Sequence, residues 1–128
     1  MLIIHTSQVV MIAIGGALGA VCRIYLSQWI QRLIPLTLPT GIIITNLIGC
    51  FLMGVMASCC DRYQISLPIK LLIISGGLGA FTTFSTFALE VMMLVSSGKM
   101  GLAILYITTS VFGGILLFGV GAVLFKGI

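Results

Sequence analysis

The sequence predicts an all-α membrane protein with four transmembrane helices. The first observation is composition: 60% of the 128 residues are hydrophobic and 6% are charged, whereas soluble domains carry roughly 25% charged residues. The second is spacing, because the charged residues leave uncharged stretches at 1–22, 33–60, 71–89 and 100–125. Each stretch is close to the about 20 residues that a helix needs to cross a bilayer core. Four crossings use most of the chain, so we expect one transmembrane domain over residues 1–128 and no enzyme.

The few charged residues argue against a nucleic-acid partner. The formal net charge is +4, but the cations stand singly near span ends and form no basic patch. The charged positions are Arg23, Arg32, Asp61, Arg62, Lys70, Glu90, Lys99 and Lys126. Residues 1–5 have neither the basic region nor the cleavage site of a signal peptide, so we expect the first span to stay in the mature protein. We expect the chain to lie in a lipid bilayer and to bind no nucleic acid.

The first two spans are separated by prolines. We predict the first helix at about residues 8–33. Pro35 and Pro39 then mark a short connection, because proline lacks an N–H group and restricts the residue before it. The second helix is predicted at about residues 40–59. The polar run from Asp61 to Gln64 predicts the central loop.

The last two spans begin after this loop. Pro68 suits the first turn of a helix, and the third span is predicted at about residues 68–95. The run Ser96–Lys99 interrupts the apolar pattern, so the fourth span is predicted at about residues 100–125. With four spans, the N-terminus, the central loop and the C-terminus share one side of the membrane.

The cations give almost no preference for one orientation in the membrane. The side of the central loop carries Arg62, Lys70 and Lys126, and the opposite side carries Arg32 and Lys99. Three against two is nearly no bias under the positive-inside rule. The chain could therefore insert in both orientations and form an antiparallel dimer. Alternatively, Arg23 or His5 fixes a single topology.

The third span contains a segment that works against a regular helix. Ser75–Ala80 holds three glycines in four residues, and it runs into the hydroxyl-rich and aromatic run Phe81–Phe87. Each glycine weakens a helix by about 1 kcal/mol relative to alanine, and hydroxyl groups compete for backbone hydrogen bonds. We predict a break near mid-membrane. Such backbone is tolerated only when it is covered by protein or lines a water-filled path, which indicates an ion or substrate site. The alternative is an ordinary helix with self-bonded hydroxyls.

Several polar and aromatic side chains could line that site. Phe81, Phe84 and Phe87 recur every third residue and would share one side of a helix, next to the hydroxyls of Ser85 and Thr86. Such a stripe is usually core packing, but the positive ring edges of phenylalanine could line a path for a small anion. Asn46 is the only asparagine, and its buried amide needs either another helix or a permeating solute as partner.

Arg23 and Glu90 are the two charges most clearly within the predicted spans, where charge is costly and commonly functional. Arg23 could draw anions to a pore mouth. Glu90 could carry protons, reach the interface or pair with Arg23. In the fourth span, Tyr106 and Ser110 are four residues apart and so lie on one helix face.

Three stretches resemble the Fluc family of fluoride channels, also called CrcB. They are Gly15–Arg23, Thr45–Gly54 and Gly76–Phe87, of which the third is the most specific. The sequence departs from the family in two places. Cys50 stands where the family commonly has serine, and Ile24 separates Arg23 from an aromatic residue that more often follows directly. We expect neither departure to affect the pore chemistry.

The resemblance implies a function and a set of site residues. The chain would be an antiparallel, dual-topology homodimer with two pores that passively export fluoride through the bacterial inner membrane. The implied pore residues, with the two hydroxyls beside them, are Asn46, Phe84, Ser85, Thr86, Phe87, Tyr106 and Ser110, with Arg23 at the vestibule. Backbone carbonyls of Gly79 and Thr82 from both subunits would hold a structural sodium ion, and no organic cofactor is implied.

Two other classes of function compete with a channel. A dual-topology, proton-coupled exporter of small cationic drugs needs a membrane carboxylate, and only Glu90 is available for that role. A non-transporting scaffold subunit would need the glycine packing but not the hydroxyl-rich segment.

Overall fold

Long apolar helices make up nearly all of the chain in a computed structural model that describes residues 5–126. The elements are α1 (Thr6–Leu33), α2 (Thr40–Arg62), α3 (Leu67–Lys70), the π-helical segment η1 (Leu71–Leu78), α4 (Gly79–Phe81), α5 (Phe84–Ser96) and α6 (Met100–Lys126). Within the described residues, four helical stretches are long and apolar enough to cross a membrane: Thr6–Leu33, Thr40–Arg62, Leu67–Ser96 and Met100–Phe125. The predicted all-helical membrane protein is thereby confirmed at this level.

Two predictions depend partly on residues outside this range. The signal-peptide interpretation falls mainly on residues 1–4, which are not among the described residues. The side chain of Lys126 is likewise not described, although its backbone ends α6.

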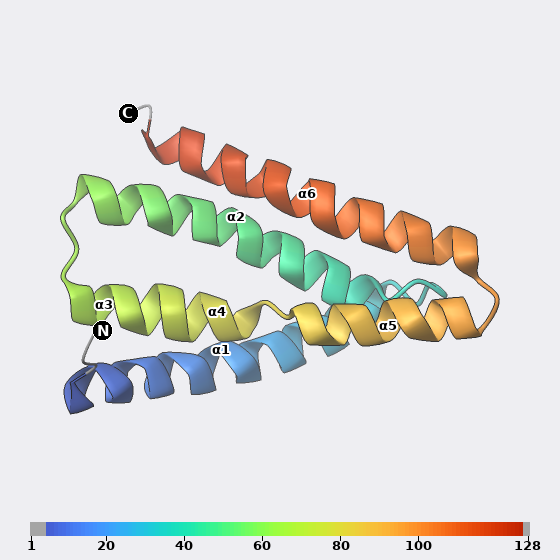
Figure 1. Cartoon of the computed structure of the whole chain (residues 1–128), viewed down its shortest axis with the longest axis horizontal. Helices are drawn as coiled ribbons and strands as arrows, with labels where there is room; N and C mark the ends of the chain where they lie inside the picture. The colour runs from blue at the N-terminus through green and yellow to red at the C-terminus, as the bar shows by residue number, and fades with distance from the viewer. Residues whose placement is uncertain (1–4, 127–128) are drawn as a thin grey trace.

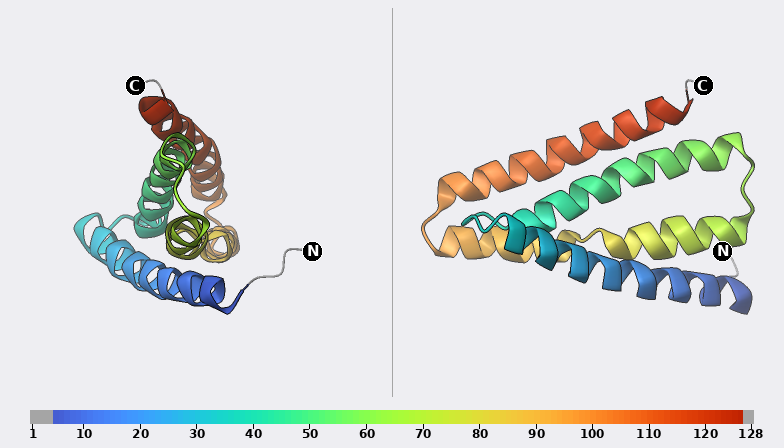
Figure 2. Two further views of the ribbon diagram at one scale, coloured as in Figure 1. Left: turned by 90° about the vertical axis from the view of Figure 1, so that its left-hand side faces the viewer. Right: turned by 180° about the vertical axis from the view of Figure 1, so that it is seen from behind.

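The helices pack in two pairs (Figures 1 and 2). The helix α2 lies along α6, and α1 lies along the segment formed by α3, η1 and α4. Glycines permit close approach in the second pair, because a Cβ atom at Gly15 would overlap the carbonyl oxygen of Leu72 and one at Gly19 would overlap that of Gly77. Small residues at such contacts let membrane helices pack backbone to backbone.

The two ends of the bundle differ in which connections they hold (Figure 1). The beginning of α1, the connection between α2 and α3 and the end of α6 lie at one end. The connections between α1 and α2 and between α5 and α6 lie at the other. This is the arrangement that four successive crossings require.

The buried core lies between α2, α5 and α6. It consists of Ile42, Ile43, Phe87, Leu94, Ala103 and Tyr106. Phe87 and Tyr106, which were expected to line a pore, are therefore part of this core.

The second helix extends further than predicted. Asp61 and Arg62, which were assigned to the central loop, form the last turn of α2. The helix ends because Gln64 adopts a positive φ of 49° and the N–H of Ile65 donates to the carbonyl of Cys60 at 3.3 Å. This closing pattern satisfies carbonyls at a helix C-terminus. Polar side chains alone thus did not end the helix.

The third span changes its backbone geometry twice (Figure 1). The glycine cluster stays helical, since Gly76 and Gly77 lie inside the π-helical segment η1. The backbone becomes extended at Thr82 and Thr83, with ψ values of 156° and 122°. Phe81 therefore belongs to α4 whereas Phe84 begins α5, and the expected single stripe of three phenylalanines is divided.

Candidate functional site

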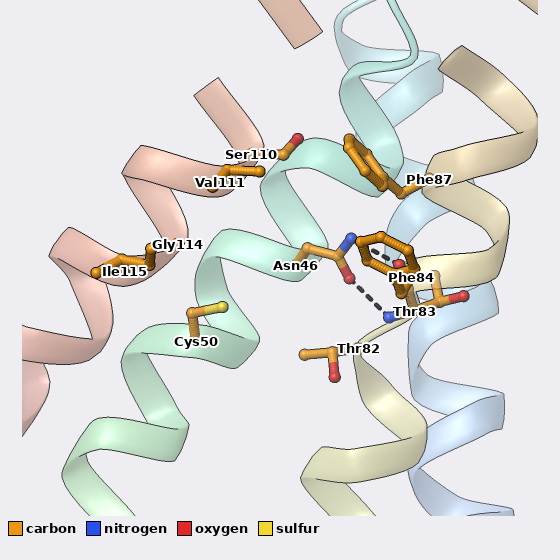
Figure 3. Close-up of a pocket in the computed structure, with 10 residues that line it drawn as sticks. All are labelled: Asn46, Cys50, Thr82, Thr83, Phe84, Phe87, Ser110, Val111, Gly114 and Ile115. Atoms are coloured by element: carbon orange, nitrogen blue, oxygen red, sulfur yellow. Dashed lines mark hydrogen bonds between the residues drawn. The ribbon is translucent and has the colours of Figure 1, made fainter. Parts of the chain in front are cut away.

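The centre of the candidate site is a pair of hydrogen bonds between α2 and the extended segment (Figure 3). The amide nitrogen Nδ2 of Asn46 donates to the carbonyl of Thr83 at 3.0 Å. The N–H of Thr83 donates to Oδ1 of Asn46 at 2.8 Å. One side-chain amide thus satisfies both polar groups of a residue that lies outside any helix. The sequence left open whether Asn46 bonds to another segment or lines a site; in the structure it bonds to the third span and also lines a cavity.

The hydroxyl of Thr83 starts the next helix. Its Oγ1 accepts the N–H of Thr86 at 3.3 Å and donates to Oγ1 of Thr86 at 3.1 Å. Threonine is a favoured N-cap because its oxygen satisfies one of the N–H groups that a helix start leaves unpaired. Thr86 is therefore engaged in beginning α5.

These bonds leave two backbone carbonyls without their usual helical partners. In a continuous α-helix, Gly79 O would accept from Thr83 N–H and Thr82 O from Thr86 N–H. Here the first N–H donates to Asn46 and the second to the Thr83 hydroxyl. Gly79 is also exposed in the single chain. Carbonyl oxygens of this kind are suitable ligands for hard cations.

We call the pair of hydrogen bonds between Asn46 and Thr83 the Asn46 clamp. A cavity of about 310 Å³ opens beside it, between α2, α5 and α6 (Figure 3). Four residues that the sequence predicted as pore-lining are brought together in its wall, namely Asn46, Phe84, Phe87 and Ser110. Thr82, which was predicted through its carbonyl, also lines it. The remaining lining residues are Cys50, Thr83, Val111, Gly114 and Ile115.

The two phenylalanines differ strongly in exposure. Phe87 is 8% exposed and Phe84 is 77% exposed in the single chain. Their ring centroids are 5.4 Å apart with an interplanar angle of 49°. Phe87 also meets the ring of Tyr106 at 5.2 Å and 84°, an edge-to-face contact. The inner ring is thus held by the core while the outer ring is uncovered.

The polar character of the cavity comes from neutral groups. None of its ten lining residues carries a formal charge. Within residues 5–126, Oγ of Ser110 is buried and has no hydrogen-bond partner, so this hydroxyl is available to a solute. The rings of Phe84 and Phe87 present edges with positive partial charge. A hydroxyl donor and ring edges of this kind are groups that can contact a small anion.

Three predicted pore residues do not line this cavity. Tyr106 is completely buried and donates its hydroxyl hydrogen to Oε2 of Glu90. Ser85 is exposed on the first turn of α5 and lies 3.4 Å from the hydroxyl of Thr83. Thr86 is engaged by the same hydroxyl. The wall thus contains four of the seven implied pore residues.

Arg23 and Glu90 are also outside this wall. Arg23 is partly buried on α1, and among the described residues its Nε has no hydrogen-bond partner. Glu90 accepts from Tyr106, and no ion pair joins it to Arg23 in the part of the chain that the structure describes. The pairing considered from the sequence is therefore not formed in the single chain.

Sequence reasoning missed Cys50 as a lining residue. The thiol was expected to have no bearing on the site, yet it lies in the wall one helical turn from Asn46. A Cβ atom at Gly114 would come within 3.2 Å of its Sγ. The spacing of four residues from Asn46 was a usable signal, because such residues share a helix face. The same spacing relates Gly114 to Ser110.

Comparisons with known proteins match nearly the whole chain. Residues 10–122 match the family model described as CrcB-like protein, Camphor Resistance (CrcB). Proteins named fluoride-specific ion channel FluC are similar to it. That of Rhizobium johnstonii is 41% identical over 105 residues, covering 81% of this chain and 84% of the relative. The protein from Magnetococcus marinus is 42% identical over 105 residues, covering 81% and 85%. That of Parabacteroides distasonis is 36% identical over 121 residues, covering 94% of both chains.

Proposed function

Because this chain belongs to the CrcB family, which its sequence matches over residues 10–122, we propose that it is a passive, fluoride-selective channel that exports fluoride from the cytoplasm. Its four apolar helices fit a multi-pass bacterial membrane protein. Relatives with 36% to 42% identity carry the name of a fluoride-specific ion channel. The family is therefore one of channels rather than enzymes.

The observation that carries the proposal is the neutral cavity beside the extended Thr82–Thr83 segment. Fluoride is small and strongly hydrated, so a selective pore must replace its water with close donors. The hydroxyl of Ser110 has no competing partner among residues 5–126, and Phe84 and Phe87, whose ring edges carry positive partial charge, line the same cavity. Asn46 contributes by holding the extended segment in place. No lining group has to gain or lose a proton for an anion to pass.

The uncovered backbone supports a homodimer. We propose that the extended segment lies near the middle of the membrane, since it divides the third span into two parts of similar length. Lipid cannot satisfy irregular backbone at that depth, yet Thr82 and Thr83 are only partly buried and the neighbouring Gly79 and Phe84 are exposed in the single chain. A second copy would cover this face. The near balance of cations on the two sides permits that copy to be antiparallel, which would give two equivalent pores.

The carbonyls of Gly79 and Thr82 fit the proposed structural sodium ion. Both have lost their usual helical N–H donors to Asn46 and to the Thr83 hydroxyl. Two such carbonyls from each copy would offer four oxygen ligands, the type that hard cations prefer. The ion would supply fixed positive charge between the subunits, and the residues of this chain would keep its ligands outside the helix.

Anion efflux from liposomes tests the proposed function. Purified protein is reconstituted into vesicles loaded with potassium fluoride or potassium chloride, and valinomycin is added to allow charge balance. We expect rapid fluoride efflux and chloride efflux at the level of protein-free vesicles. Equal leakage of the two anions would contradict a fluoride-selective channel. A second arm imposes a pH gradient with a cationic dye, and proton-driven dye uptake would instead support the exporter based on Glu90.

A further inference from the structure

Glu90 lies outside the cavity lined by Phe84 and Phe87, but it is connected to it through one side chain. The carboxylate lines a second, smaller cavity of about 210 Å³ together with Ser27, Gln28 and Gln31 of α1. On its other side, Oε2 of Glu90 accepts the hydroxyl hydrogen of Tyr106. The carboxylate is thus held between a polar cavity and the buried core.

Tyr106, which is bonded to Glu90, also contacts the ring of Phe87. Its side chain is completely buried, and its ring meets that of Phe87 at 5.2 Å in an edge-to-face arrangement of 84°. Its other aromatic neighbour, Phe84, is tilted by 49° at 5.4 Å and is 77% exposed, and the remaining residues of the core cluster are aliphatic. The edge-to-face contact is directional, because it sets a positive ring edge against a negative face.

We propose that Glu90 is a positioning residue that acts through Tyr106 to hold the ring of Phe87 at the fluoride path. This inference depends on the proposed function for its transport consequence, but its structural content does not. A buried tyrosine hydroxyl needs a hydrogen-bond partner, and among the described residues Glu90 is the partner of Tyr106. When that acceptor is lost, the Tyr106 hydroxyl needs another hydrogen-bond partner, and the Tyr106 ring changes its orientation to reach one. Phe87 then loses the contact that fixes its edge.

The role requires an acceptor and not a negative charge. Glu90→Gln keeps a carbonyl oxygen at the same distance along the side chain, so it should still accept from Tyr106. Glu90→Met keeps the side-chain length without an acceptor, and Tyr106→Phe removes the donor while keeping the ring. These three variants separate hydrogen bonding from charge and from side-chain volume.

Fluoride efflux from liposomes gives the first readout. We expect Glu90→Met and Tyr106→Phe each to slow fluoride efflux about tenfold, equivalent to the loss of one net hydrogen bond of about 1.4 kcal/mol. The double variant should be no slower than either single one, and Glu90→Gln should stay within about threefold of the unaltered protein. The ratio of fluoride to chloride efflux should fall with Glu90→Met, whereas a purely structural defect would lower the amount of active protein and leave that ratio unchanged.

A second readout does not depend on transport. 4-Fluorophenylalanine is placed at position 87, and its ¹⁹F resonance is recorded in detergent, with the same label at Phe125 near the end of α6 as control. The resonance at position 87 should shift or broaden in Glu90→Met and Tyr106→Phe but not in Glu90→Gln, and the control should not change. An unchanged resonance at position 87 in Glu90→Met, or additive losses in the double variant, would overturn the positioning role. Failure of the unaltered protein to transport fluoride would instead overturn the proposed function alone.

Discussion

The amide of Asn46 is complementary to the two polar groups of a single residue. It donates to the carbonyl of Thr83 and accepts from its N–H, so both backbone polar groups of Thr83 are satisfied although Thr83 lies outside any helix. The sequence identified Asn46 as a side chain in need of a partner but could not say which partner it has, because the two positions are 37 residues apart. Only packing of α2 against the third span brings them together.

At the residue scale, Asn46→Leu should destabilise the extended segment. The substitution keeps the approximate volume but leaves the N–H and carbonyl of Thr83 without partners, which should cost about 1 to 2 kcal/mol. We expect lower thermal stability in detergent and slower fluoride efflux. Ile48→Leu, two residues further along α2, is the matched control and should change neither measurement. A stable, fully active Asn46→Leu variant would show that the Asn46 clamp is not needed for folding or transport.

In the third span, the glycines and the threonines have different roles, whereas the sequence predicted that both would break the helix. Three glycines in four residues were expected to disrupt the helix, but Gly76 and Gly77 stay helical in η1 and pack against α1. The backbone leaves the helix at the threonines, where Asn46 and the Thr83 hydroxyl compete for the N–H groups. Helix propensity indicated that a helix in this region has low stability. It could not predict the residue at which the helix ends, because that depends on the hydrogen bond from Thr83 to Asn46 of another helix.

Substitutions in this span should separate folding of one chain from assembly of two. A Cβ atom at Gly79 would meet only the carbonyl of Ile74, at 3.5 Å, which is an ordinary contact. A Cβ atom at Gly19 would overlap the carbonyl of Gly77. We therefore expect Gly19→Val to reduce the yield of folded chain, and Gly79→Val to spare folding but impair dimerisation, sodium binding or transport.

The matched control for Gly79→Val is Thr82→Ser, which keeps the hydroxyl and the backbone carbonyl and should have a smaller effect. Size-exclusion chromatography and thermal unfolding with and without sodium separate these outcomes. Greater damage from Thr82→Ser than from Gly79→Val would argue against a site built from backbone oxygens.

For the whole molecule, the number of spans followed from charge spacing because charged side chains are excluded from the bilayer core. The helix ends were less predictable: α2 continues through Asp61 and Arg62 because its end is set by the backbone of Gln64 and Ile65. The face that a second copy would cover was not visible in the sequence, since Phe84 resembles any other core phenylalanine until its exposure is known.

The orientation of the whole molecule provides another prediction. If the subunits are antiparallel, tags at either terminus of the chain should be accessible from both sides of the membrane in about equal amounts, because the cation count is nearly balanced. Adding two lysines to the loop between α5 and α6 should shift the population toward one orientation and reduce the yield of dimer. Labelling from one side only, in the unaltered protein, would contradict dual topology.

Fluoride efflux from liposomes, measured with each ring replaced, tests most directly whether fluoride passes along the cavity lined by Phe84 and Phe87. Phe84→Ile and Phe87→Ile remove the ring edges and keep an apolar side chain. Each should slow fluoride efflux by about tenfold or more, equivalent to about 1.4 kcal/mol of barrier, in protein that still elutes as the native oligomer. Phe125→Ile, near the end of α6 and outside the cavity wall, should transport normally. Normal fluoride efflux in both Phe84→Ile and Phe87→Ile would show that fluoride does not depend on these rings and passes by another route.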